Sequence, residues 1–211
     1  MTSRSIAIFG GTFDPIHYGH LRSALSLMSD FAIDEVRFIP SALPPHRDCP
    51  AVSAEQRLAM VDLAVAGQPG FVIDDQELHR QGPSFAVDTL EAIKQEQPSS
   101  KLQLIMGMDA FEHFLQWHRW SRILELANLL IIHRPGSQLP TGEKIAALLA
   151  ERQQPIKKGL LQANGAIVIA EVTPLDISAT KIRNALKCGK SPRYLLPDAV
   201  IKFIEENQLY R

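Results

Sequence analysis

The sequence predicts an α/β protein with a doubly wound, mostly parallel β-sheet, and three observations support this. Short apolar runs alternate with amphipathic stretches along all 211 residues, which is typical of successive strand–helix–strand units. The runs are continuously apolar, as expected for strands buried on both faces. Glycines and polar residues follow the runs, and parallel sheets bind ligands beyond the carboxyl ends of their strands.

Each predicted strand is a short apolar run that is followed by a turn or loop. Residues 6–9 run into two glycines, Pro40 ends the second run, and Gly107 closes the fourth. Their lengths and boundaries favour strands over buried helices. The six predicted strands are, in chain order, 6–9, 36–39, 71–73, 102–106, 129–132 and 166–170.

The predicted helices lie between these runs. In the first, Leu21, Leu25 and Met28 recur at helical spacing. Ser53 and Ser84 are predicted N-caps of the next two helices, because a serine side chain can accept from a backbone N–H of the first turn. Three later helices are predicted over 143–152, 178–188 and 197–207.

Size and composition predict one domain over 1–211 that ends in a helical segment from about 178 to 211. Apolar residues make up 45% and charged residues 21%, and the net charge of −1 gives no broad attraction to nucleic acid or to an anionic membrane. No apolar run approaches the about 20 residues of a membrane span. Cys49 and Cys188 lie far apart, which favours reduced thiols, and we expect a cytoplasmic protein without a signal peptide.

The first strand leads into the most informative stretch of the chain. Gly10 and Gly11 allow a tight turn and a close approach of a ligand to the backbone. His17 and His20 then lie at the start of the first helix, where free N–H groups attract anions. A glycine pair after an apolar run, or two histidines at a helix start, is commonly structural when found alone. Together the two features predict a phosphate site. The spacing matches neither the Walker motif nor GxGxxG, and a metal site at the histidines has no evident third ligand.

Two further segments follow predicted strands. Ser178, Thr180 and Arg183 open a helix and can hold phosphate oxygens, although a capped helix with solvated cations would look the same. Gly107 allows a close backbone approach and Asp109 can accept from ribose hydroxyls, or the aspartate can simply cap a helix.

The stretch GGTFDPIHYGH at 10–20 resembles the HxGH signature of the nucleotidyltransferase superfamily, and in its longer form the bacterial nicotinate-nucleotide adenylyltransferase family. The resemblance extends to GMD at 107–109, to ISATKIR at 177–183 and to the closing LLP…LYR tail. It implies a Rossmann-like nucleotidyltransferase fold. The chain departs from the family pattern at Ala86, His118 and Ala179.

The resemblance also implies a role for individual residues. His17, His20 and Arg183 are the implied catalytic residues. The implied ATP-binding residues are Gly10, Gly11, Thr12, Phe13, His17, His20, Gly107, Asp109, Arg134, Ser178, Thr180 and Arg183. Those implied for nicotinate mononucleotide are Thr12, Phe13, His46, Arg47, Ser84 and Trp117. Trp117 is expected to stack on the pyridine ring, whereas Trp120 is expected to pack in the core.

These residues fit one reaction class. The sequence shows neither a Ser–His–Asp order nor a Cys–His pair. An attacking phosphate needs no such group, because it is already largely ionised at pH 7. We therefore expect adenylyl transfer from ATP to nicotinate mononucleotide in NAD biosynthesis, with Mg²⁺ carried by the ATP phosphates and water. The alternatives are a sister enzyme that takes phosphopantetheine or nicotinamide mononucleotide, and a non-catalytic nucleotide sensor.

Overall fold

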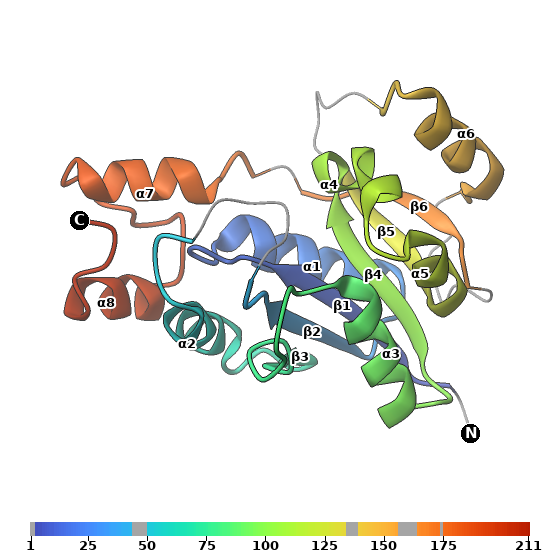
Figure 1. The fold of residues 1–211 in the computed structure, drawn as a ribbon. Coiled ribbons are helices and arrows are strands. Elements are labelled where there is room, and N and C mark those ends of the chain that lie inside the picture. Colours follow the sequence, from blue (N-terminus) through green and yellow to red (C-terminus); the bar gives the residue numbers. More distant parts are fainter. Residues whose placement is uncertain (1–2, 44–49, 134–138, 156–163, 174) are drawn as a thin grey trace.

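A computed structural model describes residues 3–43, 50–133, 139–155, 164–173 and 175–211. Its centre is a six-stranded sheet of order β3-β2-β1-β4-β5-β6 in which every pair of neighbours is parallel (Figure 1). The predicted doubly wound parallel sheet is confirmed. The strands are β1 (Ser5–Gly11), β2 (Glu35–Pro40), β3 (Phe71–Ile73), β4 (Lys101–Gly107), β5 (Ala127–His133) and β6 (Ile167–Glu171).

Helices cover both faces of this sheet. They are α1 (Tyr18–Asp30), α2 (Ala54–Val65), α3 (Ala86–Glu96), α4 (Met108–Glu112), the 3₁₀ turn η1 (Phe114–Gln116), α5 (Trp120–Leu126), α6 (Glu143–Arg152), α7 (Ala179–Lys187) and α8 (Asp198–Glu206). Among the described residues no helix has the length and apolar character needed to cross a membrane.

Two hydrophobic cores form because successive strand residues point to opposite faces. Ala7 and Phe9 of β1 face a core shared with α1, α2 and the C-terminal helices, whereas Ile6 and Ile8 face a core shared with α3, α4, α5 and α6. The C-terminal helices α7 and α8 lie at one end of the molecule, and α8 lies against α2 (Figure 1).

The strand order reverses between β1 and β4. β1 pairs with β2 on one side and with β4 on the other, so the connections that leave β1 and β4 run to opposite faces of the sheet. In sheets of this kind ligands bind at that switch point, beyond the carboxyl ends of the strands. Gly10 and Gly11, which were expected to form a turn after the first strand, are instead the last two residues of β1 and pair with Ile39 and Pro40 of β2. These glycines and Gly107 at the end of β4 lie at this switch point.

The structure corrects one further local expectation and adds two short helices. The helices α4 and α5 were not predicted, because at 5 and 7 residues they are too short to show a helical period. Ser84 is not an N-cap: Phe85 holds that position of α3 without a side-chain bond, and the hydroxyl of Ser84 accepts from the backbone N–H of Ala42 instead. The predicted cap Ser53 is confirmed, and Ser178, for which capping was the alternative to phosphate binding, does cap α7.

Candidate active site

Residues 10–15, called the glycine turn below, begin with the two glycines that end β1 and include one buried ring, that of Phe13. A Cβ added at Gly11 would lie 3.0 Å from the Phe13 ring, so the missing side chain lets that ring fold beneath the turn. Phe13 is 3% exposed and has a φ of 49°. A Cβ at Gly10 would meet nothing within 4 Å. The turn therefore offers backbone to a ligand at Gly10, while the Phe13 side chain supports it from below.

The predicted histidine pair lies at the start of α1. The rings of His17 and His20 stack with centroids 3.8 Å apart, and the backbone N–H of His17 donates to Nδ1 of His20 at 3.3 Å. Phe13 meets the His20 ring edge-on at 5.2 Å. A Cβ at Gly19 would lie 2.9 Å from two atoms of the His17 ring. The sequence HYGH therefore fixes both imidazoles locally.

Asp14 connects this turn to three distant parts of the chain. It is 6% exposed. Its Oδ1 accepts from the Tyr210 hydroxyl at 2.7 Å, and its Oδ2 accepts from the backbone N–H of Ala51 at 2.8 Å. Its backbone carbonyl accepts from Nη1 of Arg183 at 2.7 Å. Asp14 therefore holds Arg183 beside the histidine turn.

Arg57 is a buried cation beneath the site. It is 1% exposed and donates to the carbonyls of Thr12 and Ser41, each at 2.7 Å. Burial lowers the pKa of Arg57, and the nearby charge of Asp14 opposes that change. The guanidinium thus ties the loop after β1 to the loop after β2.

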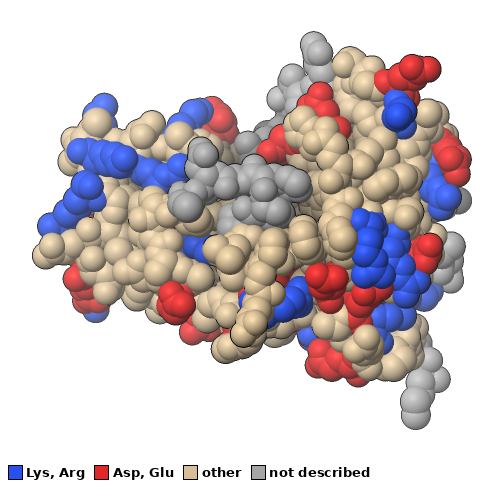
Figure 2. Space-filling view, viewed as in Figure 1, with Lys and Arg blue, Asp and Glu red and all other residues tan. Residues whose placement is uncertain are grey.

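The start of α7 brings in the remaining predicted phosphate residues. The Ser178 hydroxyl accepts from the backbone N–H of Lys181 at 3.2 Å, and the Thr180 hydroxyl accepts from Nη2 of Arg183 at 3.4 Å. A Cβ at Gly19 would lie 3.6 Å from the carbonyl oxygen of Ile177, so the starts of α1 and α7 are neighbours. Figure 2 shows Lys and Arg side chains gathered over α7.

The loops after β2 and β3 form the other side of the site. The backbone N–H of Ser41 donates to the Gly11 carbonyl at 2.9 Å. The hydroxyl of Ser84 accepts from the Ala42 N–H at 3.1 Å, and the Ser84 N–H donates to the Leu43 carbonyl at 3.1 Å. These contacts place Ser84 against the loop that follows β2, and Ser41 of that loop contacts the glycine turn.

The segment after β4 carries the remaining described candidates. Asp109 is exposed, and its Oδ1 lies 2.5 Å from where a Cβ of Gly107 would be. Trp117 is half-buried, and its ring lies 5.8 Å from that of Phe114. Trp120 packs against the same core, as expected.

Three predicted site residues lie outside the described residues: His46, Arg47 and Arg134. Within the described part of the chain no group of three His, Cys, Asp or Glu side chains could hold a metal ion. Sequence reasoning missed Arg57 and Tyr210, and it did not single out Asp14. The only signal for Asp14 was its place inside the motif, a charged residue between two apolar ones.

Glycines at the switch point of a parallel sheet, followed by paired histidines at a helix start, define a nucleotidyltransferase of the HxGH type. Residues 8–185 match the family model described as cytidylyltransferase-like. Within this class the chain belongs to the nicotinate-nucleotide adenylyltransferase family, which confirms the family predicted from the sequence. It is 47% identical over 210 residues to the probable nicotinate-nucleotide adenylyltransferase of Hydrogenovibrio crunogenus, covering 100% of this chain and 99% of the relative. It is 46% identical to that of Pseudomonas entomophila, covering 99% and 95%.

Solved structures share the fold. Plasmodium falciparum nicotinic acid mononucleotide adenylyltransferase complexed with NaAD superimposes with a TM-score of 0.73 at 18% identity, over 98% of this chain and 97% of that one. The same Plasmodium enzyme complexed with APC gives a TM-score of 0.72.

Proposed function

We propose that this protein transfers the adenylyl group of ATP to nicotinate mononucleotide, producing nicotinate adenine dinucleotide and pyrophosphate. The observation that carries the proposal is the stacked pair His17 and His20 at the start of α1, with Arg183 bonded to the carbonyl of Asp14 at 2.7 Å. This arrangement collects donors for several phosphate oxygens at one switch point. Full-length relatives named for this reaction support the choice of substrates.

The reaction requires little covalent chemistry from the side chains of the protein. A phosphate oxygen of nicotinate mononucleotide forms a bond to the α-phosphorus of ATP, while the bond from that phosphorus to the bridging oxygen of pyrophosphate breaks. The attacking phosphate is largely ionised at pH 7, since its second pKa is about 6. Catalysis then consists of aligning two anions and stabilising the charge that spreads over the phosphoryl oxygens.

The histidine pair is suited to that task. Because Nδ1 of His20 accepts from the backbone N–H of His17, the proton of the neutral ring lies on Nε2. Nε2 of His20 is therefore a donor that is already oriented. The free N–H groups at the start of α1 add partial positive charge. We assign His17 and His20 to the α- and β/γ-phosphates.

The cationic α7 side holds the departing pyrophosphate. Ser178 and Thr180 supply hydroxyls, and Arg183 supplies a guanidinium that is partly exposed and anchored through Asp14. Asp109 and Gly107 contact the adenosine part, together with Arg134. Mg²⁺ would be supplied together with ATP and held mainly by phosphate oxygens and water, in keeping with its preference for oxygen ligands and retained waters.

The acceptor nucleotide lies on the side of the glycine turn that is opposite to α7. Thr12 and Phe13 offer backbone groups where the two substrates meet. The segment around Ser84 and the ring of Trp117 face the pyridine, and His46 and Arg47 meet the acceptor phosphate.

The test is pyrophosphate release by the purified protein with ATP and each of three acceptors. We expect the fastest turnover with nicotinate mononucleotide, slower turnover with nicotinamide mononucleotide and none with phosphopantetheine. Replacing His20 by alanine removes a fixed donor to the transferred phosphate, so kcat should fall by about 10²–10³. No pyrophosphate from wild-type protein, with ATP binding intact in His20→Ala, would identify a nucleotide sensor instead.

A further inference from the structure

Arg57 lies in the first turn of α2, and its guanidinium binds main-chain carbonyls of two different loops. The residue is 1% exposed, so protein atoms enclose it. Its Nη1 donates to the Thr12 carbonyl at 2.7 Å, and its Nη2 donates to the Ser41 carbonyl at 2.7 Å and to the Ala42 carbonyl at 3.4 Å. Because the donors of a guanidinium stand in a rigid planar fork, they hold these carbonyls at a set distance from one another.

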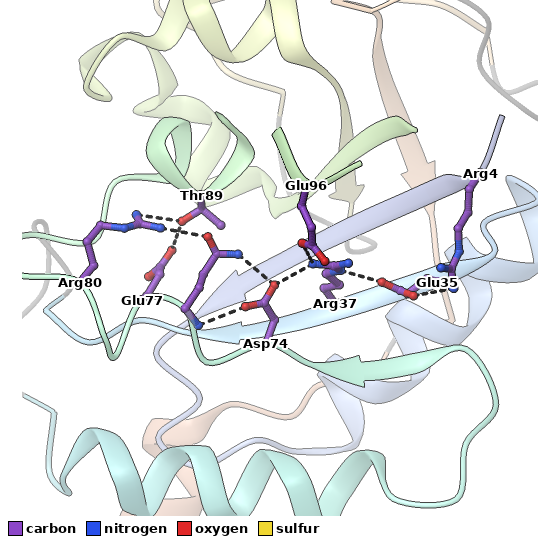
Figure 3. Close-up of polar contacts among 9 residues, drawn as sticks. Arg4, Glu35, Arg37, Asp74, Glu77, Arg80, Thr89 and Glu96 are labelled. Carbon is purple, nitrogen blue, oxygen red and sulfur yellow. Dashed lines mark hydrogen bonds and ion pairs between the residues drawn. The ribbon is translucent and has the colours of Figure 1, made fainter. Parts of the chain in front are cut away.

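Arg37, on β2, is another largely enclosed arginine, but its partners are carboxylates. Figure 3 shows its guanidinium among the side chains of Glu35, Asp74 and Glu96, to which it donates at 2.6, 3.2 and 3.0 Å. Arg37 therefore balances negative charges on neighbouring elements. The hydrogen bonds of Arg57 instead restrain the backbone itself.

Asp14 supplies negative charge near Arg57 while its oxygens bind other groups. Its charge opposes the lowering of the pKa of Arg57 that burial causes. Its Oδ1 accepts from the Tyr210 hydroxyl, and its Oδ2 accepts from the backbone N–H of Ala51. The charge of Arg57 is thus balanced in the interior, and its fork serves the carbonyls of the two loops.

The bond from Arg57 to Thr12 sets the direction of the next N–H group. In a trans peptide the carbonyl and the following N–H point in opposite directions. Because the Thr12 carbonyl points at Arg57, the N–H of Phe13 points away from Arg57, toward the opposite side of the glycine turn. The same geometry holds at Ser41, where the following N–H, that of Ala42, points away from Arg57 and donates to the Ser84 hydroxyl at 3.1 Å.

The carbonyls that Arg57 holds lie on the two sides of the proposed site. Thr12 belongs to the glycine turn, in which the Asp14 carbonyl anchors Arg183 on the ATP side. Ser41 follows β2 on the acceptor side, and its own N–H donates to the Gly11 carbonyl at 2.9 Å. The guanidinium and this backbone bond together set the separation of the two loops.

We propose that Arg57 is a positioning residue for the transfer step: its fork fixes the glycine turn against the loop after β2, so that ATP and the acceptor meet at the distance and direction that bond formation requires. The inference rests on the proposed function and adds to it a residue that contacts neither substrate. A misplacement of about 1 Å can slow a reaction by about 10²-fold. A loosened fork should therefore slow the transfer while each substrate still binds.

The first test compares the rate of transfer with the binding of each substrate in Arg57→Lys. Lysine keeps the charge, but its single ammonium lacks the planar fork that spans the two carbonyls. With both substrates saturating, we expect the single-turnover rate constant to fall about 10²-fold. Calorimetry should give a Kd for nicotinate mononucleotide alone, and for a non-hydrolysable ATP analogue alone, within about threefold of wild type.

The matched control is Arg37→Lys, the same substitution at an enclosed arginine that pairs with carboxylates. Urea unfolding should show a loss of stability in this variant, while its single-turnover rate constant stays within about twofold of wild type, because it leaves both loops in place. An equal fall in rate in the two folded variants would mean that Arg57 acts only through stability, and would overturn the inference.

The second test reads the backbone without turnover. In ¹H–¹⁵N spectra the amide signals of Phe13 and Ala42 should shift in Arg57→Lys and stay in place in Arg37→Lys. Arg57→Met, which removes the buried charge together with the fork, replaces Arg57→Lys in both tests if the lysine variant does not fold. An unchanged rate, unmoved amide signals, or weaker binding of one substrate with an unchanged rate would overturn the inference. Absent turnover in wild-type protein would contradict the proposed function, and the inference with it.

Discussion

Gly19 lies beneath the imidazole of His17, and its missing side chain leaves the room that this ring occupies. In Gly19→Ala the new Cβ would lie 2.9 Å from Cε1 and Nδ1 of a ring that is 2% exposed. The ring must shift, because real Cβ atoms do not approach so closely. We expect kcat to fall at least tenfold, because displaced donors no longer meet the phosphate oxygens.

Stability should respond differently from activity in this variant. Alanine favours a helix over glycine by about 1 kcal/mol, which offsets part of the strain, so thermal unfolding should change little while turnover falls. Gly142→Ala is the control: its φ is −63°, and a Cβ there would meet only Cγ2 of Ile145 at 3.4 Å. Full turnover in Gly19→Ala would show that the position of the His17 ring is unimportant.

At the scale of elements, α7 contributes Ile182 to a core and is also proposed to supply phosphate donors. Ser178→Ala removes the N-cap bond to the Lys181 N–H, which costs about 1 kcal/mol and lowers Tm by about 2–4 °C in a chain of this size. It also removes a hydroxyl and frees the first turn of the helix that is proposed to hold the triphosphate. We therefore expect a several-fold rise in the KM for ATP.

The comparison for that prediction is Ser53→Ala, which removes the matching cap of α2, where the hydroxyl accepts from the Gln56 N–H at 3.3 Å. Its Tm should fall by a similar amount with a smaller change in the KM for ATP. Equal kinetic effects in the two variants would mean that Ser178 acts only as a cap.

The elements also show which parts of the fold are readable from the sequence. Strands and the caps Ser53 and Ser178 are predictable because their signals lie within a few residues. Ser84 resembled a cap by the same local rule, but its hydroxyl accepts from the backbone N–H of Ala42, which is 42 residues away in the sequence. The helices α4 and α5 contain only 5 and 7 residues, which is too short for a helical period to be recognised in the sequence.

The site residues also fall into two groups, those with a local sequence signal and those without one. His17, His20, Ser178 and Arg183 stand in compact motifs and were predicted. Their supports were not, because Arg57 binds Thr12 across 45 residues and Tyr210 binds Asp14 across 196. Local patterns identify the groups proposed to meet a ligand, whereas the groups that hold them in place depend on tertiary structure.

At the scale of the whole molecule, Tyr210 is hydrogen-bonded to Asp14 in the glycine turn, 196 residues earlier in the sequence. Tyr210 is 6% exposed, and its hydroxyl donates to Asp14, so the C-terminal helices, the histidine turn and Arg183 share one anchor. Tyr210→Phe leaves a buried carboxylate oxygen without that donor. We expect the unfolding free energy at pH 7 to fall by about 1–3 kcal/mol, measured by urea unfolding, with lower turnover because Arg183 loses its fixed support.

The pH dependence of that loss separates the hydrogen bond from simple packing. Burial raises the pKa of Tyr210 well above its ordinary 10.0, and the hydrogen bond to Asp14 adds to the rise. The folded state therefore keeps the phenol proton at pH values where the unfolded chain has lost it, so the stabilisation is complete below pH 10 and declines above it. Between pH 9 and 11 the unfolding free energy of wild-type protein should fall more steeply than that of Tyr210→Phe. Tyr194→Phe, at a residue that is 83% exposed, should retain the wild-type slope. Parallel curves for wild type and Tyr210→Phe would show that the hydroxyl of Tyr210 does not link the end of the chain to its first turn.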